Sequence, residues 1–213
     1  MRPQTRRPSL QLNSFAIISE PFPIMRYLLL AFASGLVLAL TLTNTSFATD
    51  KRFDGKVIFI RHALAPGNGD PANFNLKDCR TQRNLDETGR QQARAIGKRL
   101  VASGLEFAAI YSSEWCRCLE TAQLLGLGPV TPFNGLNSFF EDHVPREPTL
   151  AKLAEKLADL PVDGKPIIMV THFVTISAVS NIAVSSGGMM MLDLETGIAR
   201  HIALAAFDPP EGN

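Results

Sequence analysis

The stretch VIFIRHALAPGN, residues 57–68, indicates the fold and the place of a functional site. Its first four residues are β-branched or aromatic, which is typical of a buried strand. Arg61 and His62 follow side by side, directly before a loop that contains proline and glycine. In open α/β sheets, ligands gather at the carboxyl ends of the strands. Arg61 and His62 are therefore expected at the edge of a sheet where chemistry takes place.

Strand and helix patterns alternate along the rest of the chain. Strands are predicted at 57–62, 108–113 and 166–172, helices at 85–103, 114–126, 148–160 and 174–184, and a closing hairpin at 189–207. The intervening segments 63–84 and 127–147 are polar and irregular, and are predicted to be long loops. The alternation predicts an α/β fold, a three-layer α/β/α sandwich with a mainly parallel central sheet.

The first 48 residues differ from the rest. Met25-Arg26 precedes an apolar run, 27–43, and Ser46-Phe47-Ala48 follows it. This order predicts an N-terminal extension with a secretory signal peptide, 1–48, cleaved after Ala48, and hence a periplasmic or secreted protein. An uncleaved membrane anchor is the alternative, because the run is about as long as the lower limit for a spanning helix. Residues 49–213 are predicted to form a single domain.

Charge and cysteine content narrow the function classes. The chain has a formal net charge of +1, so it offers no basic excess of the kind that nucleic-acid binding requires. Three cysteines in an exported protein allow one disulfide and one remaining thiol. The pair Cys116-x-Cys118 could instead hold a soft metal, but only with further ligands at suitable spacing. We expect no metal and no cofactor.

Several strand ends supply polar side chains that can converge. The strand at 57–62 ends in Arg61-His62, and the strand at 166–172 ends in His172. Arg117 falls in the first turn of the helix that follows the strand at 108–113. If the two histidine-bearing strands are neighbours, both histidines and both arginines face one another over the same sheet edge.

This constellation resembles the histidine phosphatase superfamily, the clan of phosphoglycerate mutases and acid phosphatases. The matching motifs follow in order along residues 55–207: Arg61-His62-Ala63 in place of Arg-His-Gly, Asn68, NLDETGRQQA (84–93), YSSEWCRCLETA (111–122) and VTHFVTI (170–176). The resemblance implies a phosphoglycerate mutase-like fold over 49–213. It also implies a metal-independent phosphomonoesterase that works through a phosphohistidine intermediate.

The resemblance also implies a role for each matched residue. His62 would be the nucleophile, because a neutral imidazole can form a covalent phosphohistidine. Arg61 and Arg117 would bind the phosphate, since the guanidinium fork pairs with phosphate oxygens. His172, if protonated, would add positive charge in the transition state. Asn68 stands at the position of a substrate-binding asparagine in mutase-like members.

A finer likeness concerns the substrate. CRTQRNLDETGR (79–90), LNSFFED (136–142) and the second-histidine motif without following glycines look most like an exported subgroup. That subgroup includes lipopolysaccharide core heptose-phosphate phosphatases. It implies a small phosphorylated substrate, with a cell-envelope sugar phosphate as one option. The membrane would be involved only through an uncleaved signal segment. Apart from the likeness, Cys116 and Cys118 flank Arg117, so that a disulfide from one of them to Cys79 would hold the phosphate loop; the alternative is that one of the two is a buried, inert thiol.

The sequence departs from the family where the proton donor is expected. Ser138 occupies the position of the mutase-type glutamate, and Phe173 occupies that of the acid-phosphatase aspartate. Glu141 and Asp142 are the nearest substitutes, and Glu141 is preferred because its longer side chain reaches farther. The missing acid leaves open a non-catalytic phosphate-binding or sensing module on a phosphatase scaffold. A mutase-type phosphotransferase is the other alternative, but export and Ser138 in the acid position argue against it.

Overall fold

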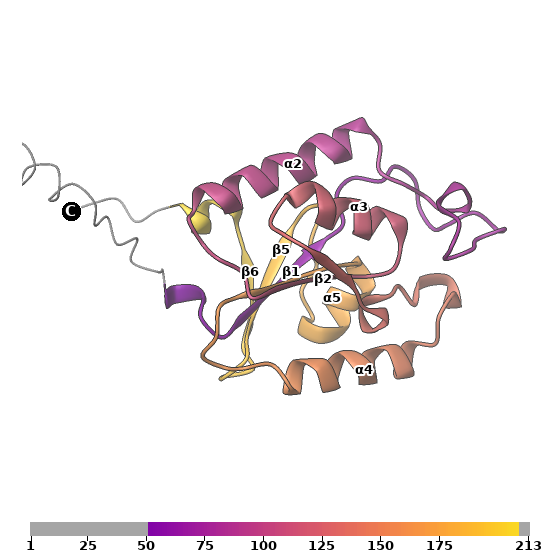
Figure 1. Ribbon diagram of the computed structural model, residues 1–213. Coiled ribbons are helices and arrows are strands. Elements are labelled where there is room, and N and C mark those ends of the chain that lie inside the picture. The colour runs from indigo at the N-terminus through magenta and orange to yellow at the C-terminus, as the bar shows by residue number, and fades with distance from the viewer. Residues whose placement is uncertain (1–50, 209–213) are drawn as a thin grey trace, which may run out of the picture. The chain divides into compact units, whose positions relative to one another are not determined.

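The computed structural model describes residues 51–208, which form a six-stranded sheet with helices on both faces (Figure 1). The strand order is β3-β2-β4-β1-β5-β6. The strands span Lys56–Arg61 (β1), Ala109–Ser112 (β2), Val130–Pro132 (β3), Ile167–Thr171 (β4), Met189–Asp193 (β5) and Ala199–Ile202 (β6). The pairs β1–β4, β2–β4 and β2–β3 are parallel, whereas β5 is antiparallel to β1 and to β6.

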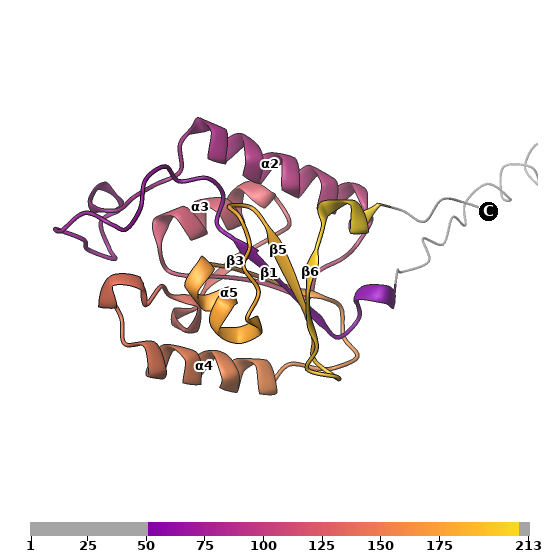
Figure 2. The same ribbon diagram turned by 180° about the vertical axis from the view of Figure 1, so that it is seen from behind.

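The helices make the outer layers of a three-layer sandwich. They span Glu87–Ala102 (α2), Cys116–Leu125 (α3), Arg146–Ala158 (α4) and Phe173–Ser180 (α5). Helices α2 and α3 cover one face, and α4 and α5 cover the other, as both views show (Figures 1 and 2). The predicted α/β/α sandwich with a mainly parallel sheet is confirmed.

The two central strands bring the histidine-bearing loops together. β1 and β4 are apolar almost throughout and their central residues are fully buried, because helices cover both faces of the sheet. Arg61 pairs with Thr171 at the end of the parallel ladder, and the His62 amide donates to the Thr171 carbonyl at 2.9 Å. The two strands are therefore neighbours, which is the condition for both histidines to lie over the same sheet edge. His62 and His172 each follow directly after one of these strands.

Each face of the sheet has its own hydrophobic core. On one face, Trp115, Ile58 and Leu100 belong to a cluster that packs β1, α2 and α3 together. On the other, Phe59 and Leu153 belong to a cluster beneath α4 and α5. Alternate residues of β1 thus point into opposite cores, which fixes the strand's register and hence the place where its polar end emerges.

The loop after the nucleophile candidate is held close to α2 and α3. The Leu64 carbonyl lies so near Gly89, in the first turn of α2, that a Cβ there would come within 2.0 Å of the oxygen. The Leu64 amide donates to Gln92 at 2.9 Å, and the Ala63 amide donates to Thr121 at 3.0 Å. The predicted N-cap, Asp86, accepts from the Gly89 amide at 2.7 Å, which fixes the start of α2.

The structure corrects several boundaries. Strand β3, within the predicted loop 127–147, was missed: it has three residues and ends in proline, so it carries little periodic signal and lies at the sheet edge. Helix α5 was predicted to reach residue 184, but it ends at Ser180 because Asn181 adopts a left-handed conformation. The closing hairpin is confirmed by the β5–β6 pairing.

The signal-peptide prediction for 1–48 lies outside the described residues. Within 51–208, none of the helices is both long and apolar enough to cross a membrane. All described residues belong to one compact unit.

Candidate active site

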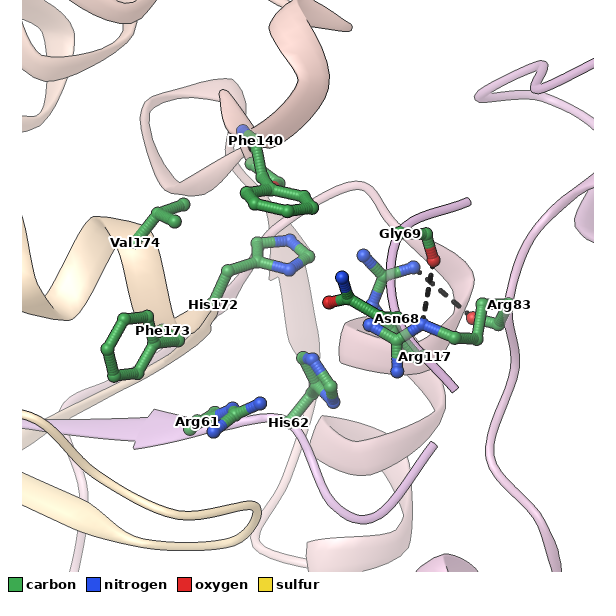
Figure 3. Close-up of a pocket in the computed structure, with 11 residues that line it drawn as sticks. Arg61, His62, Asn68, Gly69, Arg83, Arg117, Phe140, His172, Phe173 and Val174 are labelled. Atoms are coloured by element: carbon green, nitrogen blue, oxygen red, sulfur yellow. Dashed lines mark hydrogen bonds between the residues drawn. The ribbon is translucent and has the colours of Figure 1, made fainter. Parts of the chain in front are cut away.

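A pocket of about 180 Å³ lies at the carboxyl ends of β1 and β4 (Figure 3). Arg61, His62, Asn68, Arg117 and His172 all line it. The structure thus brings together every residue for which the sequence predicted a phosphate-binding or nucleophilic role. The rings of the two histidines lie edge to face, with centroids 5.5 Å apart and planes inclined by 66°.

His62 is a neutral imidazole with one free ring nitrogen. Its Nδ1 lies 2.8 Å from the Ala63 carbonyl oxygen, which accepts a hydrogen bond and so assigns the proton to Nδ1. The Nε2 lone pair is then left for attack. Burial, reinforced by the positive charges of Arg117, Arg83 and Arg61, lowers the pKa of His62 from 6.5 to about 3. The imidazole therefore remains unprotonated near neutral pH.

His172 makes hydrogen-bond contacts with buried polar side chains. Its Nε2 lies 2.8 Å from Ser113 Oγ, and Ser113 in turn lies 3.2 Å from the side-chain oxygen of Asn137. The Cys118 sulfur is 3.4 Å from the same nitrogen. Burial and the charge of Arg117 lower the pKa of His172 well below its ordinary value, so the ring is neutral when the pocket holds no anion.

Two arginines present unused hydrogen-bond donors. The Nε atoms of Arg61 and Arg117 are buried and have no hydrogen-bond partner among the described residues. Arg61 donates from Nη1 to the Val184 carbonyl at 3.0 Å, which fixes its guanidinium while leaving Nε unused. Buried donors are normally satisfied. Unpartnered guanidinium donors on a pocket wall therefore indicate that the pocket accepts an anion.

A helix terminus adds to this preference for anions. α5 begins directly after His172, and its first residues, Phe173 and Val174, line the pocket. The first amides of a helix have no partner within the helix, and the helix dipole places partial positive charge there. The wall beside His172 thus carries the same sign of potential as the arginines.

The sequence interpretation missed Arg83 and Asp70. Arg83 lines the pocket and donates from Nε to the Gly69 carbonyl at 2.8 Å (Figure 3). Its Nη1 also donates to the Ala65 carbonyl. Asp70 forms a buried ion pair with Arg117 at 2.8 Å. Arg83 lies within the run 79–90, which resembles the exported subgroup, and this likeness could have identified it as a site residue. Asp70 had none, because its place depends on the path of a long loop.

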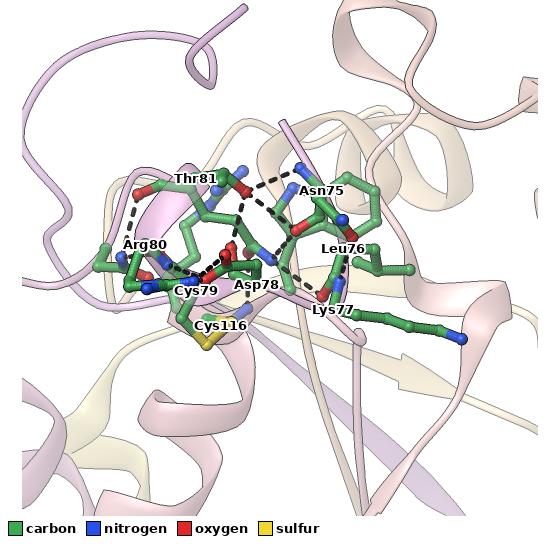
Figure 4. Close-up of a disulfide and its surroundings, with 12 residues drawn as sticks. Asn75, Leu76, Lys77, Asp78, Cys79, Arg80, Thr81 and Cys116 are labelled. Carbon is green, nitrogen blue, oxygen red and sulfur yellow. Dashed lines mark hydrogen bonds and ion pairs between the residues drawn. A yellow bond between two sulfur atoms is a disulfide. The ribbon is translucent and has the colours of Figure 1, made fainter. Parts of the chain in front are cut away.

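A disulfide fixes that loop to α3 (Figure 4). Cys79 and Cys116 are bonded across a sequence separation of 37 residues, and the bond joins the loop to the residue directly before Arg117. Cys118 is a buried free thiol whose pKa burial raises to about 12, so it is not a reactive thiolate. The alternative of a Cys116–Cys118 metal pair is wrong, because Cys116 is oxidised. Within residues 51–208, no group of three or more metal-binding side chains is placed to hold an ion.

The predicted proton donors do not line the pocket. Glu141 is 43% exposed at its side chain, and its Oε2 accepts from the Asp70 amide at 3.1 Å. Its carboxylate touches Gly69, which does line the pocket, so Glu141 stands just behind the pocket wall. Asp142 is exposed, and both residues adopt left-handed backbone conformations with φ near 60°. Their assignment as acids stays a prediction.

The outer part of the pocket is aromatic. Phe140 and Phe173 line the pocket and are 41% and 40% exposed. The guanidinium of Arg61 lies over the Phe173 ring at 5.5 Å, which holds that ring beside the cationic wall. Ser138, in the position of the family's acid, also lines the pocket. A substrate would meet cations at the base of the pocket and apolar ring surface at its mouth.

Comparisons with known proteins agree with this geometry. Residues 57–141 match the model of the histidine phosphatase superfamily (branch 1). The fold is similar to that of the protein histidine phosphatase SixA in complex with tungstate, with 15% sequence identity, 70% of this chain and 94% of that chain covered, and a TM-score of 0.50.

It is similar also to a protein of Nakamurella multipartitia described as a phosphohistidine phosphatase SixA, with 18% identity, 70% and 93% coverage, and a TM-score of 0.51. No curated protein matches the chain in sequence. The family match begins at β1 and includes the residues that supply Arg61, His62 and Arg117 to the pocket. Over residues 57–141, the chain is therefore similar to the histidine phosphatase superfamily (branch 1).

Proposed function

We propose that the protein is an exported phosphomonoesterase that hydrolyses small phosphate esters through a phosphohistidine at His62. One observation carries the proposal: the free Nε2 of His62 shares a pocket with two arginines whose Nε donors have no partner among the described residues. A phosphoryl group would satisfy those donors and meet the imidazole lone pair at the same time.

The reaction would take place in two steps. His62 Nε2 attacks phosphorus, the bond from phosphorus to the leaving oxygen breaks, and that oxygen takes its electron pair and a proton. Water then attacks phosphorus, the P–N bond breaks, and the electron pair returns to His62. Arg61 and Arg117 offset the charge on the equatorial oxygens in both steps. Because a phosphoryl group brings negative charge, it opposes the effects that lower the pKa of His172.

Asn68 and Glu141 complete the proposed site. Asn68 lines the pocket from the loop after β1 and is proposed to bind a substrate oxygen. Glu141 is proposed as the acid that protonates the leaving oxygen, with Asp142 as second choice. From its position behind Gly69, the Glu141 carboxyl would have to turn toward the pocket when substrate binds. Metal independence is part of the proposal, because arginines line the pocket and, among the described lining residues, none is a carboxylate that could hold a metal ion.

Export is supported by two independent features. The order of charged, apolar and small residues in 25–48 is that of a signal peptide. The Cys79–Cys116 disulfide favours an oxidising compartment such as the periplasm or the exterior. An exported enzyme of this kind would meet cell-envelope sugar phosphates. The exposed rings of Phe140 and Phe173 offer apolar surface to a leaving group of that size.

One observation favours a second class of substrate. Among the described residues that line the pocket, none carries a carboxyl group. Phosphates whose leaving atom needs little protonation, such as aryl and acyl phosphates, would react without a general acid. The ratio of rates for p-nitrophenyl phosphate and an alkyl phosphate separates the two classes.

The deciding experiment measures phosphate release from p-nitrophenyl phosphate by the purified protein, before and after overnight dialysis against a chelator. We expect turnover that the chelator leaves unchanged. Binding of inorganic phosphate without turnover would instead support the non-catalytic sensing module. Transfer of phosphate to an added alcohol in preference to water would support the phosphotransferase. A screen of envelope-derived and small phosphate esters would then identify the substrate.

A further inference from the structure

Asp70 binds the end of the Arg117 guanidinium and does not itself line the pocket. Its Oδ1 accepts from Arg117 Nη1 at 2.8 Å, and its Oδ2 accepts from Nη2 at 3.1 Å. The pair is buried, with the two side chains 3% and 4% exposed. Asp70 also accepts from the Trp115 indole at 3.1 Å and from the Arg83 amide at 2.9 Å. Four donors therefore fix both the position and the plane of the carboxylate.

The contacts of Arg117 determine which edge of its guanidinium stays available. Both Nη atoms are engaged by Asp70, and Nη1 also donates to the Arg83 carbonyl at 3.2 Å. Nε is the donor that has no partner among the described residues. A guanidinium can offer two parallel N–H groups from its end or from its Nε side. Because Asp70 takes the end, the Nε side is left for an anion in the pocket.

Asp70 also changes the charge balance of the pocket. Hydrogen bonds from Arg117 and Arg83 outweigh the effect of burial and lower the pKa of Asp70, so the carboxylate is ionised. Three guanidinium groups line the pocket, those of Arg61, Arg83 and Arg117. Because the Asp70 carboxylate pairs with Arg117, the net charge of these four groups is close to that needed for a phosphate monoester, which carries about −1.5 to −2 near neutral pH.

A buried ion pair is weak evidence for stability, since desolvation can exceed the Coulombic gain. The geometry points to another role: we propose that Asp70 is a positioning residue, which orients the Nε edge of Arg117 toward the transferred phosphoryl group. This inference rests on the proposed function, because it assumes that Arg117 binds phosphate. It differs from a purely structural role in one respect. Asp70 should matter for catalysis only as long as Arg117 is present.

The test is a double-mutant cycle with p-nitrophenyl phosphate. Asp70→Asn keeps the shape of the side chain but replaces one acceptor oxygen by an NH2 group. The side chain can then no longer accept hydrogen bonds from both Nη atoms of Arg117. We expect kcat/KM to fall about 10²-fold, the scale for loss of an oriented anion-stabilising donor. We expect kcat to account for most of the fall. In the Arg117→Ala background, Asp70→Asn should cause no further loss.

Asp78→Asn is the matched control. Asp78 pairs with Arg80 through both carboxylate oxygens in the same loop, but Arg80 is 89% exposed and does not line the pocket. This variant should keep kcat/KM within about twofold, because an exposed ion pair contributes little. Thermal melting of each variant separates a loss of fold from a loss of orientation.

A second variant keeps the inference testable if Asp70→Asn fails to fold. Arg117→Lys retains a charge that can pair with Asp70 but has no second edge to present. We expect it to lose activity nearly as far as Arg117→Ala does. Wild-type-like activity in Arg117→Lys would overturn the inference, as would an equal loss from Asp70→Asn with and without Arg117. A wild-type protein that neither hydrolyses p-nitrophenyl phosphate nor binds inorganic phosphate in calorimetry would instead overturn the proposed function.

Discussion

The two sides of the pocket are built differently. On the phosphate side, Arg61, His62, Arg117 and His172 come from strand ends and a helix start, and buried partners hold each of them. On the opposite side, the rim segment, residues 139–143, is a short 3₁₀ turn with exposed Phe140 and two left-handed residues. Regular structure fixes the groups that we propose to bind phosphate, the part that all proposed substrates share. An irregular segment carries the groups that would meet the part of the substrate that varies.

Replacing His62 tests the phosphate side most severely. His62→Ala removes the nucleophile, so we expect turnover to be abolished and acid-labile phosphate to be absent after quenching with labelled substrate. His201→Ala, at an exposed histidine on β6, should retain full activity. Substantial turnover in His62→Ala would show that His62 is not the nucleophile.

Removing the disulfide tests how firmly the phosphate side is fixed. In the chain-entropy model, a loop closed across 37 residues contributes about 4 kcal/mol to stability, or nearly a thousandfold in the folding equilibrium. The Cys79→Ser, Cys116→Ser double variant should lose stability on that scale in urea unfolding. Its kcat/KM should fall as well, because the loop also carries Asp70 and Arg83. An unchanged unfolding midpoint would mean that other contacts hold the loop.

The rim segment should respond to the leaving group. If Glu141 is the acid, Glu141→Gln should slow an alkyl phosphate by about 10²-fold or more and slow p-nitrophenyl phosphate much less. Asp142→Asn is the matched control, since Asp142 has nearly the same backbone conformation. A selective loss in Asp142→Asn instead would transfer the role to Asp142. Equal losses on both substrates would remove Glu141 as the proton donor.

Acid titration offers the mildest test of the phosphate side. His62 and His172 have pKa values below 6.5 in the folded protein, whereas in the unfolded chain they bind protons near pH 6.5. The unfolded state thus binds more protons between pH 6 and 4.5, so the free energy of unfolding should fall as pH falls through this range. Each histidine adds up to about 1.4 kcal/mol per pH unit. His62→Gln should have a shallower slope than wild type, and identical slopes would contradict the burial argument.

The same contrast explains what the sequence could predict. The ends of β1 and β4 were predicted because continuous apolar runs mark buried parallel strands and the polar residues after them are easy to recognise. Arg117 followed from its place at the start of a helix. Asp70 and Arg83 were missed because a disulfide and buried hydrogen bonds, not local sequence, bring that long loop to the pocket. Strand β3 was too short to show a period.

The spacing of the family motifs does not identify the proton donor. Counting along the chain placed Ser138 in the acid position, and Ser138 does line the pocket. The carboxylates three and four residues later, Glu141 and Asp142, do not line it, and both residues have left-handed backbone conformations. Such conformations cost energy in residues other than glycine and are not visible in a spacing argument.

The close approach of Leu64 to Gly89 has a consequence for how this protein can diversify. Any other residue at position 89 would place a Cβ against the Leu64 carbonyl and displace the backbone that follows His62. Substitutions at position 89 are therefore expected to disturb the backbone that positions His62. The exposed rim segment has no comparable constraint at Phe140. A lineage descended from this protein could acquire new substrates by changing the rim while the proposed phosphate-binding residues stayed the same.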